Sequence, residues 1–195
     1  VIIPPQFRAV KDFSDGLAPV QDRVNDTNYI LEWGYINKQG KKIVEPKYTW
    51  ADQFSEEMAA VADAEPTDWE MKYGYIDLSG RLVLPKKYDW AEPFSEGLAL
   101  VHIPNKNDRL DHVFRNGKGG LIDKSGGWAF IDKSGKVIFR PPLAVQEVWS
   151  FSNGLARVRI GGLYGFMDKH GKFAIEPKFR WADDFSEDLA AVAKW

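Results

Sequence analysis

One seven-residue motif returns at intervals along this chain and limits the fold that the chain can adopt. It reads Gly-Tyr-Ile-Asp-Leu-Ser-Gly at residues 74–80, and related versions occupy residues 34–40, 129–135 and 165–171. Aromatic and aliphatic side chains alternate before a short polar run that closes with Gly, a pattern typical of a strand that enters a turn. An apolar run follows each version, as at residues 82–84. The motif therefore predicts a β-hairpin in each repeat.

A second motif consists of Phe-Ser, an acidic residue or Asn, any residue, Leu or Met, Ala, any residue and Val. Its copies are spaced 41, 40, 57 and 34 residues apart and begin at Phe13, Phe54, Phe94, Phe151 and Phe185. A period near forty residues with variable insertions indicates stacked supersecondary units. The sequence Ile-Asp-Lys-Ser-Gly occurs twice in close succession, at 122–126 and 131–135, which predicts an extra strand and turn. We expect a single array of repeat units at residues 1–40, 41–80, 81–135 with the extra hairpin, 136–171 and, as a partial unit, 172–195.

Three local features give further expectations. Trp50 precedes Phe54 by four residues, and the same spacing recurs at 90/94 and 181/185, so the two rings are predicted to share one face of a short helical turn. The Ser of the second motif is predicted to cap a local turn. Pro19 interrupts the strand that begins near Phe13, which predicts an edge position for that strand.

The order of these motifs resembles a known family. Residues 87–101 read Lys-Tyr-x-Trp-Ala-x-x-Phe-Ser-Glu-Gly-Leu-Ala-x-Val, and a Trp/Tyr-Gly-Tyr/Phe-Ile-Asp-Lys-x-Gly-Lys pattern follows in other units. This combination resembles the bacterial WG-containing (KWG) repeat family along nearly the whole chain. The Trp-Gly pair itself is present at residues 33–34, whereas Tyr-Gly or Trp-Ala stands at 73–74, 128–129 and 164–165. The resemblance implies an all-β repeat module of bacterial origin, and it implies no catalytic residue and no cofactor.

Two all-β architectures fit tandem hairpins of about forty residues. One is an open solenoid-like or twisted array, in which each unit contacts only its neighbours. The other is a closed propeller-like or barrel-like ring, because a blade of three or four strands has a similar length. The uneven spacing and the incomplete last unit favour the open array.

Composition excludes several classes of function. The net charge is −2, with 26 basic and 28 acidic side chains, so we expect no nucleic-acid partner. No apolar run approaches the length of a membrane span. The chain has no Cys, which excludes disulfides and thiolate metal sites. Residue 1 is Val and lies inside a repeat, which predicts that a signal peptide or another domain precedes it. We therefore expect a secreted, periplasmic or cell-surface protein rather than a cytoplasmic one.

Residues with reactive side chains do not form a recognisable site. Each predicted hairpin turn carries a single Asp, such as Asp77, whereas calcium loops place several oxygen ligands in one short run. The Ser of the second motif recurs in every unit and has no His placed with it, so it does not resemble a nucleophile. His102 and His112 lie ten residues apart, a spacing that matches no metal-ligand pattern, and a solvated loop is the simpler interpretation. We predict no catalytic residue, no metal and no cofactor.

The leading hypothesis is a non-catalytic module that binds or scaffolds a protein or peptide. Loops of different charge, at 21–32, 62–72 and 102–118, follow equivalent strands and are expected to cluster at one edge. A second hypothesis is carbohydrate or cell-wall binding, which requires exposed aromatic rings such as Trp33 and Trp128. A third is an enzyme with its site in loop 102–118. The residues predicted to contact a partner are Tyr29, Trp69, His102, Arg109, His112 and Arg115.

Overall fold

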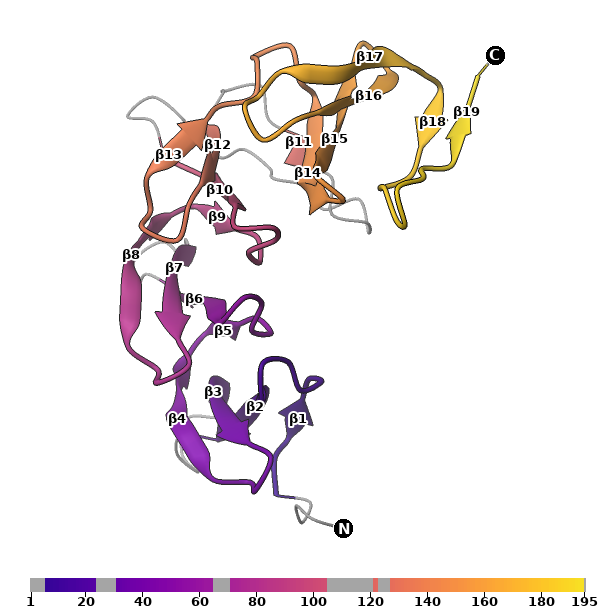
Figure 1. Ribbon diagram of the computed structural model, residues 1–195. Helices are drawn as coiled ribbons and strands as arrows, with labels where there is room; N and C mark the ends of the chain where they lie inside the picture. Colours follow the sequence, from indigo (N-terminus) through magenta and orange to yellow (C-terminus); the bar gives the residue numbers. More distant parts are fainter. Residues whose placement is uncertain (1–5, 24–30, 65–70, 105–120, 123–126, 195) are drawn as a thin grey trace. The chain divides into compact units, whose positions relative to one another are not determined.

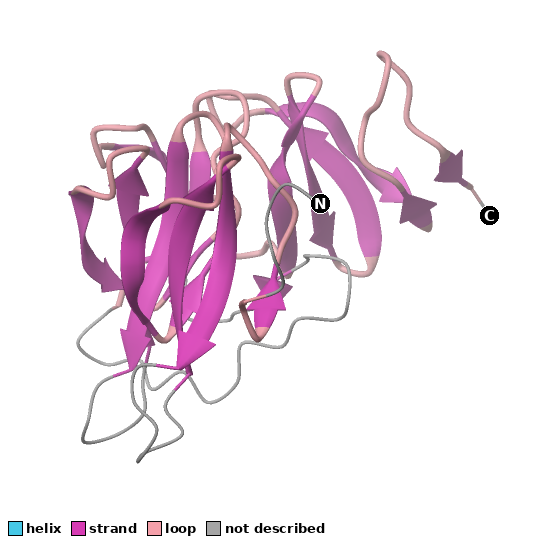
Figure 2. Cartoon of the chain, turned by 90° about the horizontal axis from the view of Figure 1, so that it is seen from below, coloured by secondary structure: helices cyan, strands magenta, loops and turns pink. Residues whose placement is uncertain are grey.

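The computed structural model describes residues 6–23, 31–64, 71–104, 121–122 and 127–194. These residues form 19 short β-strands and no helix (Figures 1 and 2). The chain divides into two compact units, Val1–Phe94 and Ser95–Trp195, and each is described by itself. The predicted all-β repeat architecture is confirmed, and none of the sheets in the described part of the chain closes into a barrel.

Unit 1 contains two four-stranded antiparallel sheets built in the same way. The first has the order β1 (Ala9–Val10), β2 (Leu17–Arg23), β3 (Leu31–Asn37), β4 (Lys42–Tyr48). The second has the order β5 (Trp50–Ala51), β6 (Met58–Ala64), β7 (Met71–Asp77), β8 (Leu82–Tyr88), and the short strand β9 (Trp90–Ala91) follows. Consecutive strands pair throughout, and each sheet extends past a predicted unit boundary, because β4 lies in 41–80 and β8 lies in 81–135.

Unit 2 continues the series with more variation. In its first sheet, β13 (Val137–Phe139), β12 (Trp128–Ile131) and β10 (Ala99–His102) are neighbours in that order. The next sheet has the order β11 (Leu121–Ile122), β14 (Glu147–Ser152), β15 (Leu155–Ile160), β16 (Leu163–Met167), β17 (Phe173–Phe179), and β18 (Trp181–Ala182) pairs with β19 (Val192–Ala193). The predicted extra strand exists as β11, but it joins the sheet of the fourth repeat. The turn predicted after it, at 123–126, lies outside the described residues.

The first motif forms the predicted hairpin, and its Asp closes the turn. Asp77 Oδ1 accepts hydrogen bonds from the backbone N–H groups of Ser79 (3.0 Å) and Arg81 (3.1 Å). Asn37 makes the same two bonds in the first repeat, at 3.0 Å each. The carboxylate and amide oxygens therefore accept hydrogen bonds from backbone N–H groups of the turn, as the turn-forming interpretation predicted.

The helical turn predicted from the Trp/Phe spacing is wrong, because Trp50–Ala51, Trp90–Ala91 and Trp181–Ala182 are short strands. The second motif, which begins at the Phe, forms a two-residue hairpin. Ser55 N donates to Met58 O (2.9 Å) and Met58 N donates to Ser55 O (3.1 Å), so only two residues connect the chain directions. Both of them, Glu56 and Glu57, have positive φ, at 54° and 67°, which is the type I′ geometry. Both central residues of the equivalent turns also have positive φ, at Asp15-Gly16, Glu96-Gly97, Asn153-Gly154 and Glu187-Asp188.

The Gly of the Trp-Gly pair is required by a bulge in the neighbouring strand. Trp33 pairs with Tyr48 and Tyr35 pairs with Val44, so between these two pairs the single residue Gly34 of β3 faces residues 45–47 of β4. A Cβ on Gly34 would lie 2.4 Å from Val44 O and 2.7 Å from the nitrogen of Pro46. Gly74 and Gly165 stand against the same part of their sheets. In the third repeat, the register between β12 and β13 shifts between Phe130 and Ile131, and Ala129 occupies the position equivalent to Gly34.

A repeated aromatic contact forms the core. Tyr35 is fully buried, its ring lies 4.9 Å from that of Phe54 in the next repeat, and its hydroxyl donates to Asp52 O at 2.7 Å. Such edge-on pairs contribute about 0.5–1.5 kcal/mol beyond their buried area. The same 4.9 Å separation recurs at Tyr75–Phe94, Phe130–Phe151 and Phe166–Phe185.

Hydrogen bonds between turns join the same neighbours. The Ser hydroxyl of one turn donates to the Phe carbonyl of the next repeat, rather than capping its own turn: Ser55 to Phe94 (2.7 Å), Ser95 to Phe151 (2.7 Å) and Ser152 to Phe185 (2.5 Å). In addition, Asp15 Oδ2 accepts from Glu57 N at 2.8 Å. The Glu96 carboxylate accepts from Gly154 N at 2.9 Å in the same way. Each turn therefore supplies an acceptor and a donor to the next.

The expectation of an edge position at Pro19 is wrong. Strand β2 lies between β1 and β3, and Pro19 pairs with Tyr35. The carbonyl of Pro19 accepts from Lys11 N at 3.0 Å, on the side of β1. In a strand, the nitrogen and carbonyl of one residue point to the same side, so the missing N–H of Pro19 also faces β1. Because β1 already ends at Val10, an inner strand accommodates the proline there.

Candidate binding surface

The structure describes only one of the six residues predicted to contact a partner. His102 is the last residue of β10, is fully buried and packs edge-on against Trp128 at 4.9 Å. The expectation that it lies in a solvated loop is therefore wrong. A Cβ on Gly127 would lie 2.3 Å from His102 Nε2, so the ring fills the space beside that glycine. The other five, Tyr29, Trp69, Arg109, His112 and Arg115, lie outside the described residues.

The strand ends that carry the variable connections are equivalent in each repeat. In four repeats the connection is bounded by two residues that pair directly across the sheet: Arg23 with Leu31, Ala64 with Met71, His102 with Trp128, and Ile160 with Leu163. The connections between them differ in length, from residues 103–127 in the third repeat to Gly161 and Gly162 in the fourth. A constant framework thus presents connections of different length and charge from the same place in each sheet.

In unit 1, charged side chains from both sheets gather near these strand ends. Lys86 on β8 forms an ion pair with Asp63 on β6, and its Nζ lies 5.0 Å from the ring centre of Tyr48 on β4. Burial, and then the negative charge of Asp63, raise the pKa of Glu32 on β3. The same two causes raise the pKa of the Tyr48 hydroxyl. We call Glu32, Tyr48, Asp63 and Lys86 the edge cluster; it joins repeats one and two.

The edge cluster has a polar atom that is not satisfied within the chain. Asp63 Oδ1 is buried and has no hydrogen-bond partner, although the side chain as a whole is 44% exposed. A buried carboxylate oxygen without a donor is unfavourable.

Aromatic rings of the Trp-Gly series are not free platforms for sugars. Trp128 is buried, with 5% of the residue exposed. Trp33 is half-buried, and Lys11 Nζ stands 5.2 Å from its ring and 4.3 Å from that of Trp50. Lys11 also donates to Ala51 O at 2.8 Å, which fixes the ammonium group over the rings. Cations on aromatic faces occupy the surface on which a sugar would stack.

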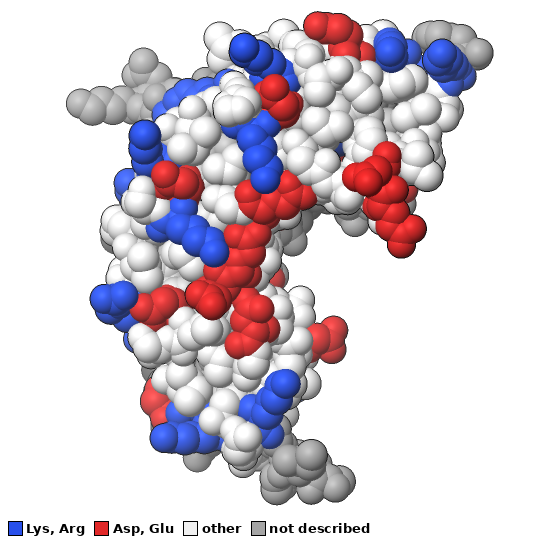
Figure 3. Space-filling model, in the orientation of Figure 1, with Lys and Arg blue, Asp and Glu red and all other residues white. Residues whose placement is uncertain are grey.

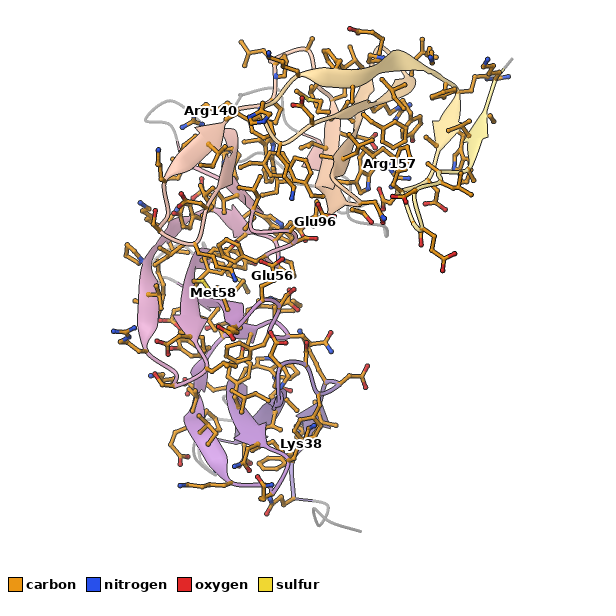
Figure 4. All side chains as sticks on the ribbon, viewed as in Figure 1. Lys38, Glu56, Met58, Glu96, Arg140 and Arg157 are labelled. Atoms are coloured by element: carbon orange, nitrogen blue, oxygen red, sulfur yellow. The ribbon has the colours of Figure 1, made fainter. Side chains whose placement is uncertain are left out.

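An analogous cation stands on aromatic rings in unit 2. Arg157 on β15 lies 4.2 Å over Trp149 and forms ion pairs with Asp183 (3.3 Å) and Asp184 (3.2 Å) (Figure 4). It also donates to Ala182 O at 2.5 Å, as Lys11 does to Ala51 O. The guanidinium thus has a structural role in joining the fourth and fifth repeats.

The described residues offer no obvious catalytic or metal centre. No group of three or more potential metal ligands occurs among them. The basic side chains of the described residues lie in separate groups on the face drawn in Figure 3 and form no extended basic footprint for nucleic acid there. The described part of the chain contains no helix long and apolar enough to cross a membrane.

A family model agrees with the repeat architecture. The model of the WG containing repeat family matches residues 1–23, 33–62, 73–106, 128–164 and 164–194. A crystal structure of a puromycin hydrolase mutant complexed with PGG is similar with a TM-score of 0.45 and 13% identity. That match covers 95% of this chain, which spans 33% of the length of that protein. No curated protein matches the chain. Because the family model matches five consecutive segments that make up most of the sequence, this chain belongs to the WG containing repeat family.

Proposed function

We propose that this chain is a non-catalytic module that binds a protein or peptide along the edge where the variable connections emerge. The observation that carries the proposal is the constancy of the strand ends. Connections as different as residues 65–70 and the two residues Gly161-Gly162 are bounded by equivalent directly paired positions. Variation confined to one place on a constant framework is the usual arrangement in repeat proteins that bind partners.

The sequence of the connections supports a polar interface. Residues 65–70 contain three acidic side chains and no basic one, whereas 105–118 contain Lys106, Arg109, Arg115 and Lys118 against two acids. In unit 1 the edge cluster adds the ion pair of Asp63 with Lys86, in which the Asp63 side chain is partly exposed. A protein or peptide offers N–H donors and charges that match such a surface.

The recurring residues also favour binding over catalysis. The repeated Ser, Asp and Tyr side chains donate or accept hydrogen bonds that hold turns and repeats together. A nucleophile needs an adjacent base within hydrogen-bond reach. Ser79 and Ser134 do donate to a carboxylate, on Asp77 and Asp132, but each carboxylate also accepts from backbone N–H groups of the same turn. The proposal therefore assigns the constant residues to the framework and the variable ones to recognition.

The test replaces a connection without altering the framework. Ala64 and Met71 pair directly, as do Ile160 and Leu163, which are joined by two glycines. Replacing residues 65–70 with Gly-Gly should therefore preserve the register of β6 and β7. Residues 24–30, between Arg23 and Leu31, can be replaced in the same way.

Proteins retained by the immobilised chain from an extract of the source cells would be identified and then titrated as purified proteins by calorimetry. We expect at least a tenfold loss of affinity in one replacement variant, with an unchanged unfolding midpoint. The matched control is Glu45→Lys, an exposed change on β4. A partner that binds both replacement variants as tightly as the unaltered chain would contradict the placement. Binding to a glycan array without any protein partner would contradict the proposed function.

A further inference from the structure

One of the type I′ turns differs from its equivalents in the first central residue. That position holds Asn153 in the fourth repeat, and an acidic residue in the other turns, at Asp15, Glu56, Glu96 and Glu187. Gly154 follows, so this turn has the sequence Asn-Gly. Asn153 is exposed and has φ 49°, and Gly154 has φ 79°. An exposed side-chain amide therefore stands beside the backbone nitrogen of a glycine.

An Asn-Gly sequence can rearrange without an enzyme. The backbone nitrogen of the Gly attacks Cγ of the Asn side chain, the bond between Cγ and the amide nitrogen breaks, and ammonia leaves with the proton of the Gly N–H. The product is a succinimide ring. Water then opens the ring at one of its two carbonyls, which gives Asp or isoaspartate without oxidation or reduction. Gly favours the attack because it has no Cβ to hinder the required rotation.

A carboxylate of the preceding repeat holds the nitrogen that would attack. Gly154 N donates to Glu96 Oε2 at 2.9 Å and to Oε1 at 3.1 Å. Glu96, labelled in Figure 4, is itself held by Lys169, whose Nζ lies 3.1 Å from Oε2 and 3.0 Å from Glu96 O. A hydrogen bond to a charged acceptor is stronger than one between neutral groups. This contact keeps the proton on Gly154 N and resists the rotation that would turn this nitrogen towards Cγ.

We propose that Asn153 is a site of deamidation and that Glu96 suppresses the reaction while the third and fourth repeats remain in contact. Loss of that contact releases the N–H of Gly154, and the succinimide then forms as it does in an unstructured Asn-Gly peptide. The contact between the two repeats thus controls a covalent change in the turn. The proposal does not depend on the partner-binding function proposed above.

The two products have different effects on the turn. Asp at position 153 keeps the backbone and supplies the kind of residue that the equivalent turns carry. Isoaspartate passes the backbone through the side-chain carbon and lengthens the turn by one atom, which a two-residue hairpin does not accommodate. Ser152 directly precedes the site and donates to Phe185 O at 2.5 Å. Isoaspartate should therefore weaken the contact between the fourth and fifth repeats.

Peptide mapping by mass spectrometry, after incubation in neutral buffer, measures the reaction at residue 153. The chain has a second Asn-Gly at 116–117, so the mass of the intact chain does not identify the site. The reference is a synthetic peptide of residues 149–158, which lacks Glu96. We expect slower conversion in the unaltered chain than in the peptide. In Glu96→Ala we expect conversion about tenfold faster than in the unaltered chain, the factor that corresponds to one charge-assisted hydrogen bond.

Three control variants separate the hydrogen bond from general effects. Glu96→Gln keeps an acceptor without the charge and should react at a rate between those of Glu96→Ala and the unaltered chain. Glu176→Ala removes an exposed carboxylate from β17 and should leave the rate unchanged. Ala129→Gly lowers stability outside the turn and should also leave the rate nearly unchanged.

Three results would overturn the proposal. The first is conversion in the unaltered chain as fast as in the peptide, because Glu96 would then give no protection. The second is an unchanged rate in Glu96→Ala. The third is equal acceleration in Ala129→Gly and Glu96→Ala, because general loosening of the fold would then explain both.

Discussion

The ring of Tyr35 lies 4.9 Å from the ring of Phe54 in an edge-on arrangement. Tyr35 belongs to the first repeat and Phe54 to the second, so one aromatic contact joins consecutive repeats. Tyr35 also donates its hydroxyl to the carbonyl of Asp52, two residues before Phe54. The same ring contact appears between each later pair of repeats, which makes it the constant element of the interface.

The hydroxyl and the ring of Tyr35 are expected to contribute separately. Tyr35→Phe removes one buried hydrogen bond and should lower the free energy of unfolding by about 1 kcal/mol. Tyr35→Ala also removes the ring and should cost about 3–5 kcal/mol. Phe130 and Phe166 occupy the equivalent positions, so a ring without the hydroxyl fits there. Urea denaturation of both variants checks this, and equal losses would show that the ring contact contributes nothing.

Periodicity was sufficient to predict the repeats, the β-hairpins and the turn role of Asp77. Periodicity did not reveal the second hairpin, because residues 13–20 were predicted as one strand, whereas Ser14 and Leu17 close a turn within it. The signal that could have revealed it is the recurrent Asp-Gly and Asn-Gly at 15–16 and 153–154, which favours a type I′ turn. The roles of the Ser hydroxyls depend on contacts between repeats, and sequence spacing alone does not show these.

Gly34 is expected to tolerate no larger side chain. A Cβ there would lie 2.4 Å from Val44 O, a backbone atom that the bulge holds in place. Gly34→Ala should therefore lower the free energy of unfolding by about 2–3 kcal/mol. The control is Ala129→Gly at the equivalent position of the third repeat, which should cost about 0.5–1 kcal/mol from backbone entropy. If the two substitutions cost the same in urea denaturation, the bulge does not explain the Trp-Gly pair.

Substitutions at the type I′ turns should have opposite signs at two equivalent positions. Gly16 has φ +84° and no atoms near a built Cβ, so Gly16→Ala introduces only backbone strain and should cost about 1 kcal/mol. Glu57 adopts φ 67° at the equivalent position, so Glu57→Gly should stabilise by about 0.5–1 kcal/mol. Thermal unfolding of the two variants checks the signs. Destabilisation by Glu57→Gly would mean that the glutamate side chain makes a contribution larger than the strain.

The hairpin turn at Asp77 should weaken in acid. Hydrogen bonds from the Ser79 hydroxyl, and then from backbone and side chain of Arg81, lower the pKa of Asp77 to about 2 from 3.8. A folded-state pKa below the unfolded one gives stability that is present above about pH 4 and is lost as the pH falls towards about 2. Asp77→Asn should keep the turn, because Asn37 makes the same two backbone hydrogen bonds, but it should be less stable than the unaltered chain at neutral pH because the amide carries no charge.

The comparison for that prediction is the slope of stability against pH. Between about pH 4 and about pH 2, the unaltered chain should lose more stability than Asp77→Asn, since the amide does not titrate. Asp77→Ala should cost about 1 kcal/mol at neutral pH, through the loss of the accepted hydrogen bonds. A variant Asp77→Asn with the same acid dependence as the unaltered chain would assign that dependence to other carboxylates.

Sequence reasoning identified the variable connections but not the residues beside them. The edge cluster combines Glu32, Tyr48, Asp63 and Lys86, which come from four different strands of two sheets. Their proximity follows from the stacking of the repeats, and the spacing along the chain does not indicate it. His102 was predicted to lie in a loop because polar residues follow it in the sequence. In the structure it is the last residue of its strand and pairs with Trp128.

The central claim is that constant side chains hold consecutive repeats together. The most direct measurement is a double-mutant cycle on Tyr35→Leu and Phe54→Leu, followed by urea denaturation. We predict a coupling energy of about 0.5–1.5 kcal/mol between them. For Tyr35→Leu with Phe94→Leu, whose ring contacts Tyr75 instead, we predict a coupling within about 0.3–0.5 kcal/mol of zero. Strictly additive effects for Tyr35 and Phe54 would contradict the account.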